Sequence, residues 1–142
     1  METDRALAGA EQEFKAPTGF LAKAPISSAI RVGDLIFISG QIGIDNAGAV
    51  VPGGVGEQTR ACLQGIQDIL QSMGAAMADV VQTRVFLTDF NGYDDFNRVY
   101  REYFSSPFPT RSTVGAPQLA LGAEIEIEAV AFRRQTVPQA IG

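Results

Sequence analysis

The sequence contains no histidine, and its single cysteine is Cys62. Without histidine, neither a histidine-based catalytic triad nor a histidine-ligated metal site can form. One cysteine allows no disulfide bond within the chain, as is typical of proteins in a reducing compartment. We therefore expect a cytoplasmic protein whose chemistry depends on arginine, carboxylate, hydroxyl, amide and backbone groups.

Positive charge is also scarce. Lys15 and Lys23 are the only lysines, and both lie near the N-terminus. A Schiff-base lysine usually lies in a desolvated pocket of the core, so this position disfavours that class of enzyme. Eleven basic residues against 16 acidic residues give a net charge of -5. This charge disfavours nucleic acids and anionic membranes as partners, because both require a basic surface.

Long hydrophobic runs are missing from the N-terminus. The stretch METDRALAGAEQEF carries charges throughout, which predicts neither a signal peptide nor a membrane span. The 142 residues are 46% apolar and 19% charged, which suits one folded domain with one core. We expect a flexible N-terminal arm over residues 1–20, the domain over 21–134 and a C-terminal tail over 135–142.

The pattern of apolar residues predicts an α+β domain with the element order ββαβαββ. The expected strands are AIRV, LIFIS, DVVQTRVFLTDF, RSTV and EIEIEAVAF, and the expected helices are EQTRACLQGIQDILQSMG and NGYDDFNRVYREYF. In the first helix, the apolar residues Cys62, Ile66, Ile69, Leu70 and Met73 share one face, which places the only thiol in the core.

The strand LIFIS is apolar on both of its faces. Such a strand is typically covered on both sides. Two helices can cover only one face of the sheet. The sequence therefore predicts that the second face is buried by self-association.

Two segments near the C-terminus carry candidate chemistry. In EIEIEAVAF, the alternation of a strand places Glu124, Glu126 and Glu128 on one face. These glutamates either face water or include one that binds a water in a pocket. In FPTRSTV, Arg111 opens the preceding strand, and a guanidinium is the best side chain for gripping a carboxylate through two hydrogen bonds. If the two strands pair, Arg111 either binds a substrate beside a glutamate or forms a structural ion pair with Glu126.

Four motifs then resemble one known family. The sequence is similar to the Rid (YjgF-type) family of enamine/imine deaminases in four segments. They are IRVGDLIFISGQIGID, the two helical segments with the strand between them, FPTRSTV and EIEIEAVA. The resemblance covers about residues 22–134. It implies a chorismate-mutase-like fold with a mixed sheet and two helices on one face. It also implies a homotrimer whose active sites lie in clefts between adjacent subunits.

The resemblance implies hydrolysis of reactive 2-imino or enamine carboxylic acids to 2-keto acids and ammonia, without a metal or organic cofactor. The family's carboxylate-binding arginine falls on Arg111, and its water-positioning glutamate falls on Glu126. Ser39 and Gly40 match its S-G-Q motif, and the asparagine of its second helix falls on Asn97. These residues are the expected substrate site.

Two positions depart from the family pattern. Ile26 stands where a substrate-contacting tyrosine is usual, which removes a ring and a hydroxyl from the cleft. Thr113 replaces a frequent cysteine, and its hydroxyl is expected to support the nitrogen end of the substrate. Which imino acid is used therefore stays open at this point.

Three alternative functions follow from these features. One is a non-catalytic small-carboxylate-binding or regulatory module, which needs Arg111 but not Glu126. Another is a catabolic deaminase of an aminomuconate-like intermediate. RNA cleavage, a label that some relatives have carried, is disfavoured by the acidic charge and the absence of histidine.

Overall fold

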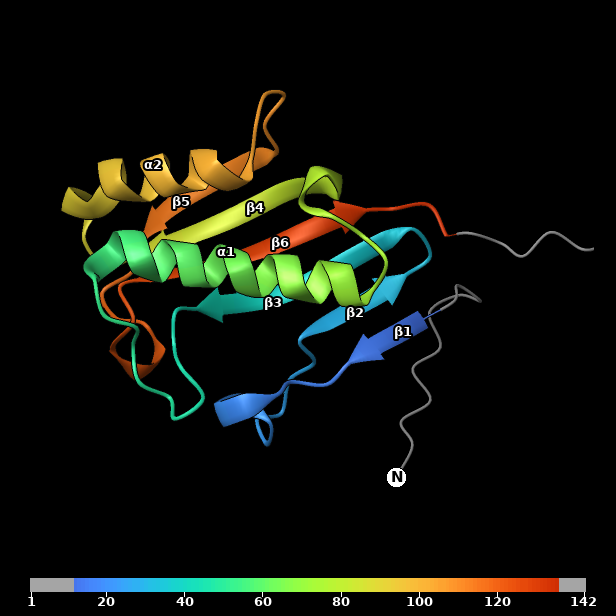
Figure 1. The fold of residues 1–142 in the computed structure, drawn as a ribbon, viewed down its shortest axis with the longest axis horizontal. Helices are drawn as coiled ribbons and strands as arrows, with labels where there is room; N and C mark the ends of the chain where they lie inside the picture. The colour runs from blue at the N-terminus through green and yellow to red at the C-terminus, as the bar shows by residue number, and fades with distance from the viewer. Residues whose placement is uncertain (1–11, 136–142) are drawn as a thin grey trace, which may run out of the picture.

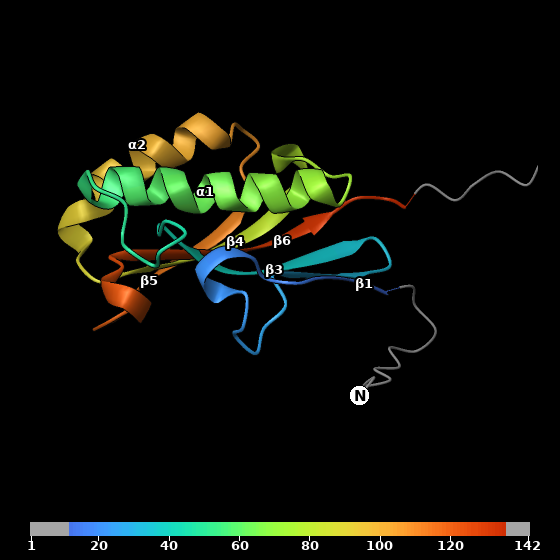
Figure 2. The ribbon, with the colours of Figure 1, turned by 60° about the horizontal axis from the view of Figure 1, so that its bottom comes forward.

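Two α-helices lie side by side on one face of a mixed sheet, as the computed structural model of the chain shows (Figures 1 and 2). The structure describes residues 12–135. Its main elements are β1 (Gln12–Lys15), β2 (Ala29–Val32), β3 (Leu35–Ile42), α1 (Gly54–Ser72), β4 (Val80–Leu87), α2 (Tyr93–Tyr103), β5 (Thr110–Gly115) and β6 (Ile125–Phe132). The expected α+β architecture with two helices on one face is confirmed. Neither helix of this described region combines the length and apolar character that a bilayer crossing requires.

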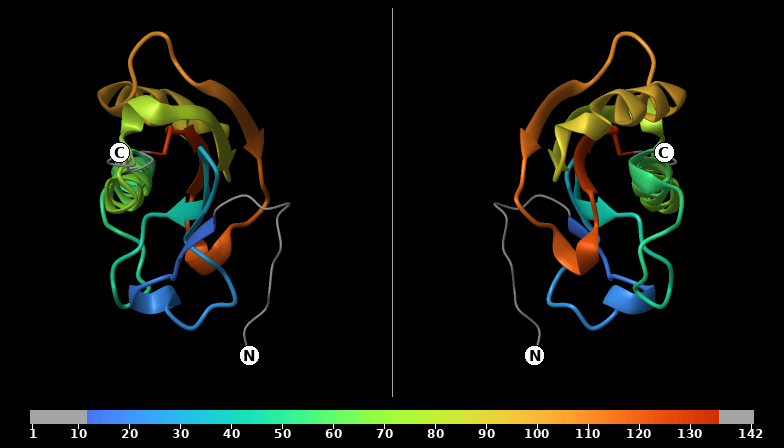
Figure 3. Two further views of the ribbon diagram at one scale, coloured as in Figure 1. Left: turned by 90° about the vertical axis from the view of Figure 1, so that its right-hand side faces the viewer. Right: turned by 90° about the vertical axis from the view of Figure 1, so that its left-hand side faces the viewer.

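The strands form one six-stranded sheet in the order β1-β2-β3-β6-β4-β5. All neighbours are antiparallel except β4 and β5, which run parallel and are connected through α2. The sheet is strongly curved when it is viewed along its long axis (Figure 3). In this strand order, β5 lies at one edge of the sheet, and the two strands β6 and β4 separate it from β3.

The N-terminal part of the chain corrects one expectation. Residues 12–15 form the edge strand β1, which pairs with β2, although the sequence predicted an arm over residues 1–20. Two of the four residues in QEFK are charged and only one is strongly apolar, so the segment lacks the pattern of a buried strand. The rest of that arm, residues 1–11, and nearly all of the predicted tail, residues 136–142, lie outside the described residues.

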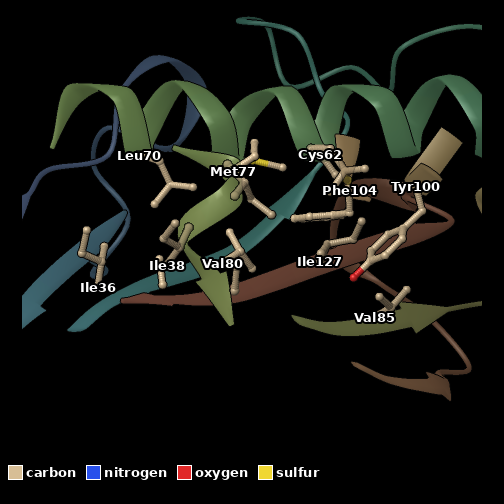
Figure 4. Close-up of a cluster of buried hydrophobic side chains, with 14 of the residues drawn as sticks. Ile36, Ile38, Cys62, Leu70, Met77, Val80, Val85, Tyr100, Phe104 and Ile127 are labelled. Carbon is tan, nitrogen blue, oxygen red and sulfur yellow. The ribbon is translucent and has the colours of Figure 1, made fainter. Parts of the chain in front are cut away.

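Helix α1 buries the face that its sequence predicted. Cys62, Ile66 and Leu70 are fully buried against the sheet, and Figure 4 shows Cys62 and Leu70 above the strand residues Ile38 and Ile127. The chain leaves the helix through Gly74, whose φ of +77° is a conformation that glycine adopts at little energetic cost. There the Gly74 amide donates to the Gln71 carbonyl and the Ala75 amide donates to the Leu70 carbonyl, which satisfies the last turn.

Strand β3 is apolar on both faces, as predicted, but only one face is covered within a single chain. Ile36 and Ile38 are buried beneath the helices. Leu35 is 38% exposed and Phe37 is 45% exposed on the opposite face. We call the sheet face that the helices leave uncovered the open face. It is the surface for which the sequence predicted self-association, and the trimer itself stays a prediction.

Candidate active site

The position of Arg111 follows from the register of the edge strand. Arg111 in β5 lies opposite Thr83 in β4. Thr83 is fully buried, and its hydroxyl lies 2.8 Å from the Tyr100 hydroxyl of α2. Because directly opposed residues share one face of a sheet, the Arg111 side chain also lies on the helix-covered face, beneath α2.

Two side chains of α2 hold the Arg111 guanidinium. Its Nη1 donates to Asn97 Oδ1 at 2.9 Å, and its Nη2 donates to the Tyr93 hydroxyl at 3.0 Å. The guanidinium carbon also lies 4.9 Å from the ring centroids of both Phe96 and Tyr100, within the range of a cation–π contact. Two of the five N–H groups are therefore bound, and about three stay available to a ligand.

The held guanidinium forms part of the wall of a small pocket of about 260 Å³. The other lining residues are Tyr93, Asn97, Tyr100, Arg101, Phe108 and Pro109. Two of the seven lining side chains are thus arginines, and within residues 12–135 no acidic side chain lines this pocket. The hydrogen bond with Asn97, and next the positive charge of Arg111, lower the pKa of the Tyr93 hydroxyl. We call this volume the arginine pocket; its size and charge suit a small anion.

Thr113 belongs to the same strand face as Arg111, because it lies two residues further along β5. It is half-buried and pairs in register with the buried Val85 of β4. The Thr113 hydroxyl therefore lies on the same sheet face as the Arg111 guanidinium. Its role towards a substrate stays a prediction.

Glu126 lies on the other face of the sheet. Its neighbours Ile125 and Ile127 are fully buried beneath the helices, so Glu126 and Glu128 point to the open face. Burial, and next the negative charge of Glu128, raise the pKa of Glu126 above its usual value. This carboxyl is thus a stronger base than an exposed glutamate would be, which suits a proton acceptor.

A bulge in β3 makes room for this glutamate. The register with β6 shifts between Ile38 and Gln41, so β3 carries an extra residue there. A Cβ on Gly40 would overlap the carboxylate of Glu126 in its present position, so the absence of a side chain lets the two approach closely. Sequence reasoning assigned Gly40 to substrate binding, and the geometry gives it a close approach to the glutamate.

The same bulge is joined to the loop that contains Ile26. The hydroxyl of Ser39 donates to the Ser27 carbonyl at 2.6 Å. Ile26 is 44% exposed, and it lines with Ser39 a hollow of about 860 Å³ on the open face. Ile26, Ser39, Gly40 and Glu126 thus form one group, which we call the glutamate group.

The arginine pocket and the glutamate group do not meet within one subunit. Thr83 lies opposite both Arg111 and Ala129, and Ala129 is three residues from Glu126 along β6. At about 3.4 Å per residue, that offset is about 10 Å along the strand, and two strand spacings add about 10 Å across the sheet. The two side chains also lie on opposite faces.

Two possibilities that the sequence left open do not hold within a single subunit. Strand β5 does not pair with β6, because β4 lies between them. Across the described part of the chain, Arg111 makes no ion pair with Glu126 and bonds instead to Asn97 and Tyr93. The pKa of Glu126 is raised rather than lowered, so no neighbouring positive charge dominates it within one subunit.

The third glutamate of the final strand has a structural role. Glu124 lies just before β6, and its carboxylate accepts a 2.8 Å hydrogen bond from the buried Gln58 of α1. The Glu124 amide donates back to the Gln58 side chain at 2.9 Å. These two hydrogen bonds anchor the start of β6 to α1. Glu124 thus differs from Glu126 and Glu128, which point to the open face.

Sequence reasoning missed Tyr93 as a partner of Arg111. The available signal was its spacing, because Tyr93 lies four residues before Asn97 and so shares its helix face. The helix itself was predicted correctly, but the polar stripe formed by Tyr93 and Asn97 was not.

Comparisons with known proteins agree on one family. The family model described as Endoribonuclease L-PSP matches residues 17–133. A RutC family protein of Sinorhizobium fredii is 44% identical over 110 residues, which cover 77% of this chain and 87% of that protein. The human 2-iminobutanoate/2-iminopropanoate deaminase is 42% identical over 113 residues, covering 79% of this chain and 82% of that protein. The crystal structure of a putative endoribonuclease from Thermotoga maritima superposes with a TM-score of 0.77 at 40% identity, covering 85% of this chain and 94% of that one.

Proposed function

The chain belongs to the endoribonuclease L-PSP family, also known as the Rid or YjgF family, and from this membership we propose that it is an imine deaminase. The reaction is the hydrolysis of 2-imino or enamine carboxylic acids to 2-keto acids and ammonia, in the cytoplasm and without a metal or organic cofactor. The observation that carries the proposal is the Arg111 guanidinium, which two side chains orient at the wall of a small pocket.

Arg111 binds the substrate carboxylate. A guanidinium can present two parallel N–H groups to a carboxylate, which fixes the orientation of the acid as well as its position. The bonds to Asn97 and Tyr93 restrict the rotation of the guanidinium before the substrate arrives. This preorganisation lowers the entropy that is lost on binding and sets the imine carbon at a defined place.

Glu126 activates the water. A protonated imine is already electrophilic at carbon, so the protein has to deliver a water and accept its proton. The water oxygen forms a bond to the imine carbon as its proton passes to the Glu126 carboxylate. Glu126 then returns that proton to the nitrogen. As the carbon–nitrogen bond breaks, the remaining O–H proton passes to the Glu126 carboxylate, the carbonyl of the keto acid forms and ammonia leaves. The Thr113 hydroxyl supports the nitrogen during this step, while Ser39, Gly40 and Ile26 border the substrate.

Each active site takes its arginine pocket from one subunit and its glutamate group from the next. Within one subunit, Arg111 and Glu126 lie on opposite sheet faces, too far apart to share a small acid. The open face carries the exposed apolar side chains of Leu35, Phe37 and Phe132, which favour burial against another copy. A closed homotrimer would form three equivalent sites of this kind.

Imines made in place by an amino-acid oxidase provide the test of activity. We expect the purified protein to accelerate the release of ammonia and 2-keto acid, with no gain from added metal and no loss with a chelator. A heat-denatured sample is the control. Binding of 2-keto acids without any acceleration would instead identify the non-catalytic carboxylate-binding module, and loss of activity on chelation would overturn the cofactor-free mechanism.

Mixed oligomers test the assignment of each site to two subunits. Arg111→Ala and Glu126→Gln are each expected to inactivate the protein when they are expressed alone. Co-expressed, they should recover about one quarter of wild-type activity, because about that fraction of inter-subunit sites pairs an intact arginine with an intact glutamate. If both residues served one site within a subunit, no mixed oligomer could contain a complete site, and activity would stay at the level of the single variants.

A further inference from the structure

One stripe of α2 runs along the arginine pocket. Tyr93, Asn97 and Arg101 are spaced four residues apart, so they lie one above another on the same helix face. All three line the pocket. The first two hold Arg111, and the third continues the stripe about one helical turn further, with its own guanidinium.

The charge of Arg101 is unpaired within residues 12–135. Over the residues that the structure describes, its guanidinium forms no hydrogen bond and no ion pair. The other arginines of this helix layer are paired: Arg98 lies 3.7 Å from Asp95, and Arg60 binds Glu102. The charge of Arg101 reaches the pocket, since it is among the causes that lower the pKa of the Tyr93 hydroxyl.

We propose that the arginine pocket selects acids with two carboxylates, Arg111 binding the one next to the reacting carbon and Arg101 the distal one. The substrate class is a 2-imino dicarboxylic acid. The inference rests on the proposed function, because it takes the role of Arg111 from there and adds the specificity.

The spacing of the two arginines fits such an acid. Four residues of helix correspond to about 6 Å along the axis from Asn97, which binds Arg111, to Arg101. A five-carbon diacid built from bonds of about 1.5 Å spans about 5 Å between its carboxyl carbons when extended. The pocket volume of about 260 Å³ is small enough to bring both ends of such an acid against its walls.

Arg101 also has a simpler role in stabilising α2, which the experiment must distinguish from ligand binding. It lies in the last turn of α2, where a positive charge interacts favourably with the helix dipole. That role affects the stability of the fold and treats every ligand alike. Only the binding role makes the protein prefer an acid with two carboxylates over an acid with one.

Binding of two product analogues provides the test. We expect calorimetry to show that the wild-type protein binds 2-oxoglutarate more tightly than 2-oxobutanoate. Arg101→Gln should weaken 2-oxoglutarate binding about tenfold, equivalent to about 1.4 kcal/mol, and change 2-oxobutanoate binding less than twofold. The matched control is Arg98→Gln, which removes the same charge from the same helix but from a residue outside the pocket lining, and should change neither affinity.

Three results would overturn the inference. They are equal wild-type affinity for the two acids, an equal loss of both affinities in Arg101→Gln, and a lower melting temperature in Arg101→Gln with both affinities unchanged. Hydrolysis of the imines formed from glutamate and from 2-aminobutyrate should show the same selectivity in kcat/KM. Because the binding assay needs no turnover, selective binding without hydrolysis would refute the proposed function alone, and hydrolysis without selectivity would refute this inference alone.

Discussion

Arg111→Lys is expected to lower kcat/KM for imine hydrolysis about thirtyfold, which corresponds to about 2 kcal/mol of transition-state binding. Lysine keeps the positive charge, but it cannot present two parallel donors to a carboxylate. Bonds to both Asn97 and Tyr93 would use two of the three lysine N–H donors and leave at most one for a ligand. Steady-state kinetics on imines made in place measure this loss.

Arg98→Lys is the control for this exchange, because Arg98 is exposed on α2, lies outside the pocket lining and pairs with Asp95. We expect it to leave both activity and melting unchanged. Arg111→Lys itself should lower stability by only about 1 kcal/mol, the order of a hydrogen bond. Wild-type turnover in Arg111→Lys, together with a lower melting temperature, would mean that the arginine supports the fold and not the substrate.

Local patterns were sufficient to predict most of the fold. The apolar face of α1 and the alternation in β6 each follow from one periodicity within one segment. The positions of these elements therefore agree with the structure to within a few residues. Cys62 was placed in the core on the same ground, and burial raises the pKa of its thiol far above the usual range.

The arrangement of the strands could not be predicted in the same way. The sequence left open whether β5 and β6 pair, and the parallel crossover through α2 places β4 between them. That arrangement depends on contacts between distant segments, which no single window of sequence contains. As a result, the sequence singled out Arg111 and Glu126 as candidate site residues, but it did not reveal that they lie on opposite faces of the sheet in one subunit.

Glu126→Gln is expected to lower kcat for imine hydrolysis about a thousandfold, within the range lost when a general base is removed. Glutamine has nearly the same shape, so the close approach to Gly40 is kept. The affinity for 2-keto acids should change little, because Arg111 still binds the carboxylate. Single-turnover kinetics and calorimetry on the same sample separate these two effects.

The raised pKa of Glu126 has two expected consequences for the pH dependence of activity. A base must lose its proton to act, so kcat/KM should fall on acidification at a pH above the usual glutamate range. Glu128→Gln should move this fall to lower pH, because it removes the neighbouring negative charge that helps to raise the pKa of Glu126. It also frees Arg84, which lies 3.1 Å from Glu128, to act in the same direction.

Stability should change in the opposite direction to activity. The folded protein binds the Glu126 proton more tightly than the unfolded chain does, so the contribution of this group to stability falls as pH rises through the folded-state pKa. At neutral pH the ionised glutamate is therefore destabilising, and Glu126→Gln should melt at a higher temperature than the wild type. Below about pH 4 both states are protonated and the difference should disappear. An inactive variant that melts lower than the wild type at pH 7 would show that Glu126 is a structural carboxylate rather than a base held at a cost to the fold.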